Sequence, residues 1–418
     1  MLAAATAAVT LAACSDGTAP PQRREATTAR AASREGMILG ALRPLRVTVV
    51  TASAALAGPQ GATVPTYDGS GQVVHPDVVV FPEPWHGHRF WMAITPYPGG
   101  NASFENPTLL ASDDGVAWRL PEGAPNPTVG PPTTGYLSDP DLVYRADRDE
   151  LWLYYRHSGV GEDEIWLTRT GDGVSWSQPT VVFHRRSYGH VSPSVAPTGR
   201  GGWRAWFVDA GAVGCRATRT VVRELRSSDG VRWHPRRRAR SAGTTPVTEA
   251  SPVRLEQPGH TIWHLDVQYV PAWGEYWALY AAYPAAAGGC APTGVFFARS
   301  RDGVRWTTYP TPLLAREEAP LFRDLVYRST FAYDSASRTL TVWYSGATLN
   351  PGSDGDTTPR YAWSAAVATY AIDDVLAHVA QPTAAAAVGE IATSRAARAL
   401  RWRPATAARP GVRAEEMP

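Results

Sequence analysis

The sequence has no lysine and only three cysteines among its 418 residues. Arginine therefore supplies all the positive charge apart from histidine, and the 40 basic and 38 acidic residues leave a formal net charge of +2. So small a charge gives no electrostatic reason to expect nucleic acid or an anionic membrane surface as a partner. No segment approaches 18 consecutive apolar residues, so the sequence predicts no membrane-spanning helix.

The first 14 residues form a short apolar run that ends in Leu-Ala-Ala-Cys, and a polar segment rich in proline and threonine follows. This pattern resembles a bacterial lipoprotein signal, in which the chain is cut before the cysteine and the cysteine carries the lipid. We therefore expect lipidation at Cys14, a disordered tether over 15–44, and export to the bacterial cell envelope with the lipid as the only membrane contact. The alternative is an alanine-rich terminus in which the cysteine occurs by chance.

Only Cys215 and Cys290 remain after Cys14. In an exported protein, two further cysteines more often pair than stay free. Each follows an aromatic run typical of a strand, so we predict a disulfide between two loops. Without a matching set of histidines, the two cysteines are weak evidence for a metal site.

A seven-residue pattern, Ser/Thr-x-Asp-Gly-x-x-Trp, occurs four times, at 112–118, 170–176, 227–233 and 300–306. Asp-Gly between two strand-like runs is a strong hairpin signal, because a type I′ turn needs positive φ at both central residues. The tryptophan would begin the next strand and pack its indole against a neighbouring sheet. The pattern therefore predicts architecture rather than catalysis.

Three further features recur in phase with this turn: an upstream aromatic strand, a polar and often proline-containing run before it, and a proline-led run after the tryptophan. Aligning the polar runs at Asp77, Asp141, Ser194, Asp266 and Thr330 gives steps of 64, 53, 72 and 64 residues. Five units of four short strands at this spacing predict an all-β fold, a five-bladed β-propeller with four-stranded blades. Closing the sheets into a ring leaves few exposed edges.

We expect the propeller to occupy 45–375. Its fifth unit lacks the Asp-Gly turn, and the run LRVTVVTA at 45–52 could supply the missing outer strand, since propellers commonly close by pairing the two chain ends. The remaining 376–418 is rich in alanine, arginine and proline and is predicted to be a low-complexity tail.

In a propeller the first strand of each blade lines the central channel, and residues i and i+2 of a strand point to the same side. The channel positions are His75 and Asp77, Asp139 and Asp141, Ser192 and Ser194, His264 and Asp266, and Arg328 and Thr330. Ionisable groups are rarely brought together in a core unless they pair or bind something. We expect the Arg328 guanidinium and the carboxyl groups of Asp77, Asp139 and Asp266 to surround one cavity.

Three more candidates lie near the same end of the channel. Glu105 opens the third strand of the first unit, and Tyr97 and Tyr283 are expected on long loops, where their rings could stack on sugars. The structural alternative is that aspartates at strand ends accept backbone N–H bonds and that His264 is a satisfied core histidine.

Residues 60–375 resemble the five-bladed propeller glycosidases of glycoside hydrolase families 43, 32, 68 and 130 in the blade openings HPDVVVF and SDPDLVY, the aromatic second strands and the Asp-Gly-x-x-Trp turns. In those families an aspartate before a blade-one proline is base or nucleophile, a second aspartate before a blade-two proline stabilises the transition state or tunes a pKa, and a glutamate is the general acid. Asp139 matches the second aspartate. His75 stands in the first position, with Asp77 two residues later, and Ser192 stands where the blade-three acid is expected.

The resemblance implies a glycoside hydrolase acting on an oligosaccharide or polysaccharide, which needs one protonated and one ionised carboxyl group. The candidate catalytic residues are Asp77, Asp139, Glu105 and Asp266, and the candidate substrate-binding residues are His75, Asp141, His264, Arg328, Tyr97 and Tyr283. We favour Glu105 as the acid. Two alternatives stay open: a catalytically inactive propeller that displays the same pocket to a glycan, and a repeat scaffold for protein partners.

A metal on the propeller axis is a further hypothesis. Oxygen ligands from Asp139, Asp266 and water would suit a hard cation such as Ca²⁺, with His264 as a neighbour. We expect carbohydrate as the partner of a monomeric protein.

Overall fold

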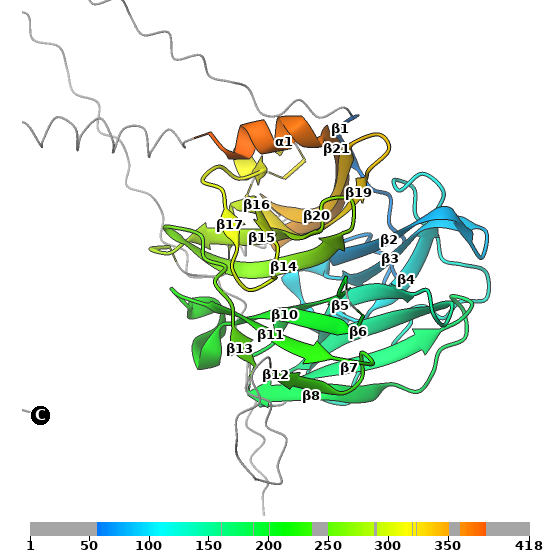
Figure 1. The fold of residues 1–418 in the computed structure, drawn as a ribbon. Coiled ribbons are helices and arrows are strands. Elements are labelled where there is room, and N and C mark those ends of the chain that lie inside the picture. Colours follow the sequence, from blue (N-terminus) through cyan, green and yellow to red (C-terminus); the bar gives the residue numbers. More distant parts are fainter. Residues whose placement is uncertain are drawn as a thin grey trace, which may run out of the picture. The chain divides into compact units, whose positions relative to one another are not determined.

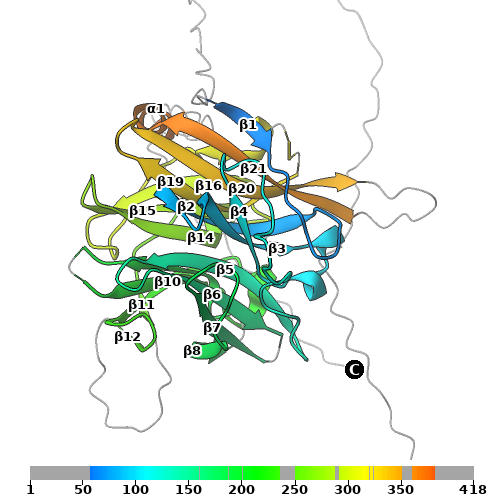
Figure 2. The ribbon, with the colours of Figure 1, turned by 90° about the vertical axis from the view of Figure 1, so that its right-hand side faces the viewer.

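The structure is a computed structural model that describes residues 57–381, with gaps at 160, 187, 200, 236–249, 288–290, 320, 323 and 351–359. Its five antiparallel sheets follow one another along the chain, and their innermost strands contact each other in cyclic order, the last against the first. Figures 1 and 2 show the sheets as successive blades. The predicted all-β, five-bladed propeller is confirmed.

The first four blades follow the predicted order of short strands. Blade one contains β2 (Val73–Trp85), β3 (His88–Pro96) and β4 (Thr108–Ser112), and blade two contains β5 (Tyr136–Arg145), β6 (Glu150–Ser158), β7 (Glu162–Thr170) and β8 (Thr180–Arg186). Blade three contains β9 (Val191–Pro197), β10 (Trp203–Asp209), β11 (Val221–Ser227) and β12 (Trp233–Pro235), with β13 (Ser251–Pro252) also paired to β11. Blade four contains β14 (His260–Val270), β15 (Glu275–Pro284), β16 (Gly294–Ser300) and β17 (Thr307–Thr308), with β18 (Leu314–Ala315) also paired to β16. Blade one has three strands instead of the expected four, and an isolated bridge between Ala111 and Arg119 lies at its outer edge.

The fifth blade combines both ends of the propeller. It contains β19 (Leu325–Asp334), β20 (Thr339–Asn350) and β21 (Arg360–Ala371), and β1 (Ala57–Gly61) pairs with β21 as its outer strand. The closing strand predicted at 45–52 lies outside the described residues. An N-terminal strand does complete the fifth blade, but it is β1, which follows the predicted run in the chain.

The Asp-Gly turns share one hydrogen-bond pattern. In the first, Ser112 Oγ accepts the N–H of Gly115 at 2.9 Å, and Asp114 Oδ1 accepts the N–H groups of Val116 and Ala117 at 2.8 Å. Gly115 has a positive φ of 74° but Asp114 does not, so this is not the type I′ turn that the sequence predicted. The aspartate forms the turn by accepting N–H groups that follow it, which requires no left-handed backbone at the aspartate itself.

The same turns join neighbouring blades. The Trp343 indole of blade five donates to the Gly115 carbonyl of blade one at 2.7 Å, and the Trp206 indole of blade three donates to the Gly303 carbonyl of blade four at 2.9 Å. The tryptophans of the repeated pattern are buried or half-buried. The pattern therefore serves the assembly of the ring, as predicted.

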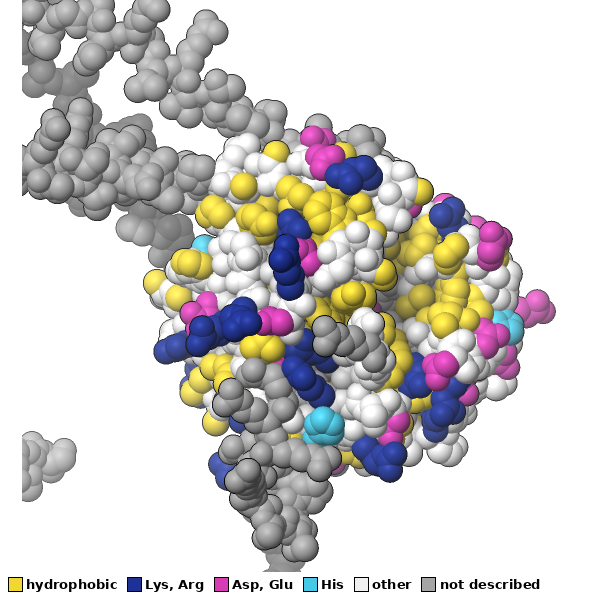
Figure 3. All heavy atoms as spheres, in the orientation of Figure 1, with side chains coloured by type: hydrophobic (Ala, Val, Ile, Leu, Met, Phe, Trp, Pro, Cys, Tyr) yellow, Lys and Arg dark blue, Asp and Glu magenta, His cyan; other side chains and the backbone are white. Residues whose placement is uncertain are grey.

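The helix α1 (Ile372–Val379) follows β21, and its buried residues Val375 and Val379 belong to a core cluster between blades four and five. The first of the two compact units of the chain ends at Ala380. Among the described residues, no helix has the length and apolarity needed to cross a bilayer. On the face shown in Figure 3, basic and acidic side chains are interspersed with apolar ones.

The cysteine predictions fall mostly outside the described part of the chain. Cys215 lies in the short 3₁₀ helix Gly211–Arg216. Cys290, Cys14 and the tether at 15–44 are not among the described residues. The disulfide and the lipid anchor therefore stay predictions.

Candidate active site

Three inner strands contain a residue in the left-handed region: His75 (φ 60°), Asp139 (φ 51°) and Ser192 (φ 54°). Each precedes a proline, and strand register shifts at each point, which marks a β-bulge. Such a backbone costs about 1–3 kcal/mol for a residue other than glycine and persists where its surroundings fix it, commonly at functional sites. The bulges set the direction of these side chains in the channel.

His75, Asp139 and His264, here called the histidine cluster, come together from blades one, two and four. Asp139 Oδ1 lies 3.7 Å from His75 Nε2 and 3.2 Å from His264 Nδ1. Glu105 Oε2 lies 3.2 Å from His75 Nδ1, and all four side chains are buried. Ligand atoms of the three cluster residues lie within 4.8 Å of one another, a spacing at which one metal ion could contact all three.

Several polar atoms of this site are buried without a hydrogen-bond partner. They are His75 Nε2, Asp139 Oδ1, Glu105 Oε2 and both ring nitrogens of His264. Leaving such an atom unsatisfied costs about 1–3 kcal/mol, so a group from outside the chain is expected to complete the site. Burial lowers the pKa of His75 and of His264, which keeps both imidazoles neutral and able to bind a metal.

Asp139 is held from the other side by Arg156, a residue of β6. Arg156 Nη1 lies 3.4 Å from Asp139 Oδ2, and Arg156 Nη2 donates to Asp163 Oδ1 at 2.9 Å. Ser138 Oγ donates to Asp139 Oδ2 at 3.0 Å. The guanidinium favours the ionised form of Asp139 and leaves its Oδ1 near the two histidines.

Ser192 occupies the blade-three position in which the resemblance implied a general acid. Its hydroxyl donates to the Leu265 carbonyl at 3.0 Å and so joins blade three to blade four. Arg328 of blade five is fully buried, donates through Nη2 to the Pro193 carbonyl at 3.3 Å, and has its Nη1 3.8 Å from Asp139 Oδ1. The blade-three position therefore carries no acid, and a cation lies close to Asp139.

Tyr327 forms a wall of the histidine cluster. Its ring centroid lies 4.3 Å from that of His264 and 5.6 Å from that of His75. Its hydroxyl accepts the Trp263 indole N–H at 3.2 Å. Burial raises the pKa of Tyr327 well above its ordinary value, so the hydroxyl keeps its proton and can donate it in a hydrogen bond.

Sequence reasoning missed Tyr327 and Arg156. Alternation along β19 would place Tyr327 and Arg328 on opposite sides, but a register shift between Val326 and Ser329 brings both near Asp139. Arg156 lies on the second strand of its blade, where the repeated polar positions give no signal. No local pattern in the sequence marks the bulge that brings Tyr327 beside His264.

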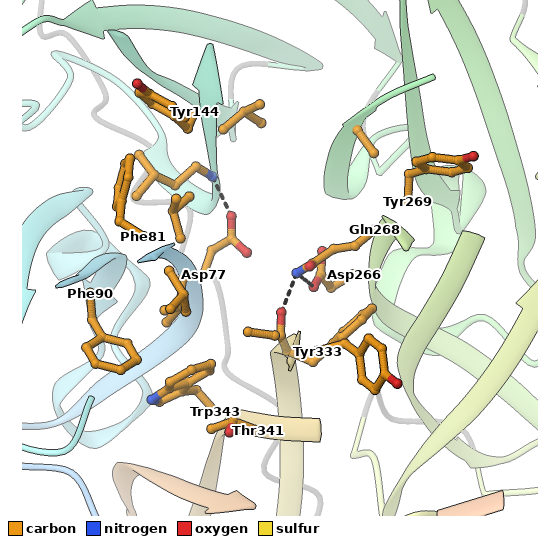
Figure 4. A pocket seen from close by; sticks show the side chains of 18 of the residues that line it. Asp77, Phe81, Phe90, Tyr144, Asp266, Gln268, Tyr269, Tyr333, Thr341 and Trp343 are labelled. Carbon is orange, nitrogen blue, oxygen red and sulfur yellow. Dashed lines mark hydrogen bonds between the residues drawn. The ribbon is translucent and has the colours of Figure 1, made fainter. Parts of the chain in front are cut away.

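Asp77, Asp141 and Asp266, here called the acidic cluster, lie two residues further along the inner strands. Their carboxylate oxygens lie within 4.8 Å of one another and line a cavity of about 630 Å³ (Figure 4). Asp77 accepts the N–H of Leu142, and Asp141 accepts the N–H of Val195 at 3.0 Å, so each joins its blade to the next. Burial and the neighbouring Asp266 raise the pKa of Asp77 to about 7.

The expected single cavity is therefore divided into two sites. Asp139 lies with the histidines, and Asp77 and Asp266 lie in the acidic cluster, because residues i and i+2 are about 6.6 Å apart along a strand. Glu105 contacts His75 in the first of these sites. The calcium ligands suggested by the sequence, Asp139 and Asp266, belong to different clusters, and the calcium ion stays a prediction.

The two tyrosines expected on loops differ in their surroundings. Tyr97 follows β3, is half-buried and packs edge-on against Trp363, with 5.2 Å between ring centroids. Tyr283 lies within β15, is fully buried and donates its hydroxyl to the Ala217 carbonyl at 2.6 Å. The prediction that Tyr283 lies on a loop, where it could stack on a sugar, is wrong, because β15 continues to Pro284.

Known proteins similar to this chain process carbohydrates, although no family model matches it. The chain is 32% identical over 322 residues, 66% of its own length, to an "A type blood N-acetyl-alpha-D-galactosamine deacetylase" of Flavonifractor plautii. It spans 40% of the length of that curated relative.

Two solved structures are also similar to this chain. The crystal structure of an N-acetylgalactosamine deacetylase from F. plautii, in complex with blood group B trisaccharide, has a TM-score of 0.65 at 27% identity and covers 78% of this chain and 98% of that one. A structure from the GH130 family of mannoside phosphorylases has a TM-score of 0.48 at 12% identity, covering 80% of this chain and 96% of that one. The chain is a five-bladed β-propeller similar in sequence and fold to a carbohydrate-processing enzyme.

Proposed function

We propose that the histidine cluster hydrolyses the N-acetyl group of an N-acetylated amino sugar and releases acetate and an amine. The observation that carries this proposal is the set of two neutral imidazoles and one carboxylate whose ligand atoms are buried without partners. Similarity to a deacetylase of N-acetylgalactosamine supports the substrate class.

The histidine cluster fits a divalent metal. Two nitrogen donors and one carboxylate oxygen form a ligand set that Zn²⁺ and related metals take in catalytic sites, with a further position open to substrate. His75, Asp139 and His264 would hold the ion, which would supply Lewis-acid polarisation of the acetyl carbonyl. The unpartnered nitrogens and oxygen of the cluster are the observation that supports this fit.

Glu105 would transfer the proton. Burial raises the pKa of its carboxyl group, and its Oε2 lies 3.2 Å from His75 Nδ1. Glu105 would take a proton from the attacking water and return it to the amine nitrogen as the C–N bond breaks. The Tyr327 hydroxyl would donate to the carbonyl oxygen, on which negative charge develops.

Acetate release from an oligosaccharide that ends in N-acetylgalactosamine tests this proposal. We expect EDTA to abolish the release and added Zn²⁺ or Mn²⁺ to restore it. His264→Ala, which removes a metal ligand, should lower kcat/KM at least about 100-fold. The matched control is His184→Ala, because His184 is an exposed histidine in β8 and does not belong to the histidine cluster. Acetate release that survives both EDTA and His264→Ala would overturn the proposal.

Glycoside hydrolysis is a second candidate, supported by one feature of the same site. Glu105 and Asp139 are both buried beside His75, and burial raises the pKa of Glu105 while Arg156 favours an ionised Asp139. One protonated and one ionised carboxyl group are what glycosidases use. The two candidates differ in product, since a glycosidase releases reducing sugar and leaves acetyl groups in place. Sugar binding without either product would instead support the inactive glycan-binding alternative.

We also propose the export and covalent features that the sequence indicates. Cys14 would carry the lipid that anchors the protein to the bacterial cell envelope, and Cys215 would pair with Cys290. The protein would act as a monomer.

A further inference from the structure

Asp163, the second residue of β7, is a fully buried carboxyl group that the proposed reaction does not use. Its Oδ1 accepts hydrogen bonds from Arg156 Nη2 and from Ser158 Oγ, each at 2.9 Å. Its Oδ2 accepts the backbone N–H of His190 at 3.2 Å. A buried ion pair loses hydration that its own attraction does not reliably restore, so stability alone does not account for it.

We infer that Asp163 is a positioning residue, which fixes Arg156 so that Asp139 presents one oxygen to a metal at the histidine cluster. The inference rests on the proposed function and deepens it, because it assigns the group that orients a metal ligand. Asp163 would act through Arg156 and would not touch the metal or the substrate.

Asp163 holds one edge of the Arg156 guanidinium. Arg156 Nη2 donates to Asp163 Oδ1 at 2.9 Å and to Ser158 Oγ at 2.8 Å. Arg156 Nη1 lies 3.4 Å from both Ser138 Oγ and Asp139 Oδ2. Because hydrogen bonds weaken with distance and those to a carboxylate are the stronger kind, the edge at Asp163 sets the position of the guanidinium.

Arg156 in turn determines which oxygen of Asp139 faces the histidines. Asp139 Oδ2 is contacted by Arg156 Nη1 and accepts the Ser138 hydroxyl at 3.0 Å. Asp139 Oδ1 has no hydrogen-bond partner among the described residues, and it lies 3.2 Å from His264 Nδ1 and 3.7 Å from His75 Nε2. A carboxylate whose second oxygen is already hydrogen-bonded is oriented before a metal binds, which strengthens the binding.

The Asp163 carboxylate also offsets positive charge near the histidine cluster. The Arg156 guanidinium is always protonated, and it contacts the same carboxyl group that would bind the metal. Arg328 brings a second guanidinium, whose Nη1 lies 3.8 Å from Asp139 Oδ1. Both cations repel a divalent ion, and screening is weak in a buried site. Removing the charge of Asp163 is therefore expected to weaken metal binding.

Arg204 and Glu224 of blade three form a comparable buried ion pair. Like Arg156 and Asp163, they lie in the second and third strands of one blade, here β10 and β11. Arg204 also donates to the Asp302 carbonyl, in the Asp-Gly turn of blade four, and neither Arg204 nor Glu224 belongs to the histidine cluster. Glu224→Gln is therefore the matched control for Asp163→Asn.

Co²⁺ titration of the metal-free full chain, followed by the visible absorption of the bound ion, tests the inference without any substrate. Asp163→Asn removes the charge but keeps the size of the side chain and an oxygen that can accept the Arg156 and Ser158 hydrogens. We expect its Co²⁺ dissociation constant to rise about 10–100-fold, the effect typical of residues behind metal ligands. Glu224→Gln should leave the dissociation constant unchanged.

Equal Co²⁺ affinity in the wild type and in Asp163→Asn would overturn the inference. An equal loss of affinity in Asp163→Asn and Glu224→Gln would also overturn it, because it would show a general effect of breaking a buried ion pair. If Asp163→Asn does not fold, Arg156→Lys takes its place with the same expected loss, since lysine keeps the charge but not the planar fork that holds two carboxyl groups.

The wild type separates this inference from the proposed function. A wild type that binds Co²⁺ and releases acetate leaves the proposed hydrolysis standing even where Asp163→Asn binds as tightly. A wild type that binds no Co²⁺ would overturn the metal site and this inference together.

Discussion

The account of the repeated turns predicts that two glycines of one turn differ sharply in what they tolerate. Gly171 and Gly173 lie in the second Asp-Gly turn. A methyl group added to Gly173 would lie 2.5 Å from ring atoms of Trp91, in a neighbouring blade, and Gly173 has a φ of 77°. A methyl group added to Gly171 would meet no atom within 4 Å. Gly173→Ala should therefore be strongly destabilising and Gly171→Ala should not.

The magnitude follows from two separate costs. Left-handed backbone costs an alanine about 1–2 kcal/mol, and overpacking against a fully buried ring costs about 1–3 kcal/mol more. Gly173→Ala should thus lower the free energy of unfolding by about 2–5 kcal/mol. Gly171→Ala should change it by no more than about 1 kcal/mol, and the change should be stabilising if its backbone suits alanine.

Urea unfolding followed by tryptophan fluorescence measures both effects in the same assay. A lower midpoint with an unchanged m-value would show a loss of stability in Gly173→Ala. If the two variants unfold at the same urea concentration, the turn does not pack on Trp91 as described, and the role assigned to the repeated pattern is wrong.

Three shorter predictions concern other parts of the chain. Burial opposes ionisation of Asp172, but hydrogen bonds from the backbone N–H groups of Ser175 and Val174 outweigh it and lower its pKa to about 2. The ionised carboxylate therefore stabilises the fold above its unfolded pKa, and this stabilisation is lost as the pH falls towards 2. In Asp172→Asn the melting temperature should depend less on pH between about 4 and 2, by a modest amount because the group is largely exposed. Under denaturing, non-reducing conditions Cys215 should resist alkylation until a reductant is added, and alkylation without reductant would refute the disulfide. A radioactive fatty acid should label the wild type and not Cys14→Ser; equal labelling would exclude the lipid anchor.

The fold could be predicted because the local patterns that form each blade are repeated in the sequence. The Asp-Gly turn and the aromatic strand recur in phase, and each copy fixes the same local structure, so the number of blades follows from the spacing. The strand that the structure pairs with β21 is Ala57–Gly61, whose sequence AGPQG has no aromatic or β-branched residue to indicate a strand.

The arrangement of the candidate site could be predicted only in part. Strand alternation indicated that the blade openings face the channel. It does not say how far along the channel each side chain lies, and this position separates Asp139 from Asp77 and Asp266. The bulges that bring Tyr327 beside His264 depend on contacts between blades, which no local pattern records. Tyr283 was misplaced for a related reason, since burial against Ala217 is set by a neighbouring blade.

Mass spectrometry of the product tests the central claim most directly. An oligosaccharide that ends in N-acetylgalactosamine is incubated with the metal-loaded protein and, in parallel, with His264→Ala. The proposed function predicts that the wild-type product has lost an acetyl group and kept every glycosidic bond, and that the variant leaves the substrate unchanged. A product with cleaved glycosidic bonds and intact acetyl groups would contradict it.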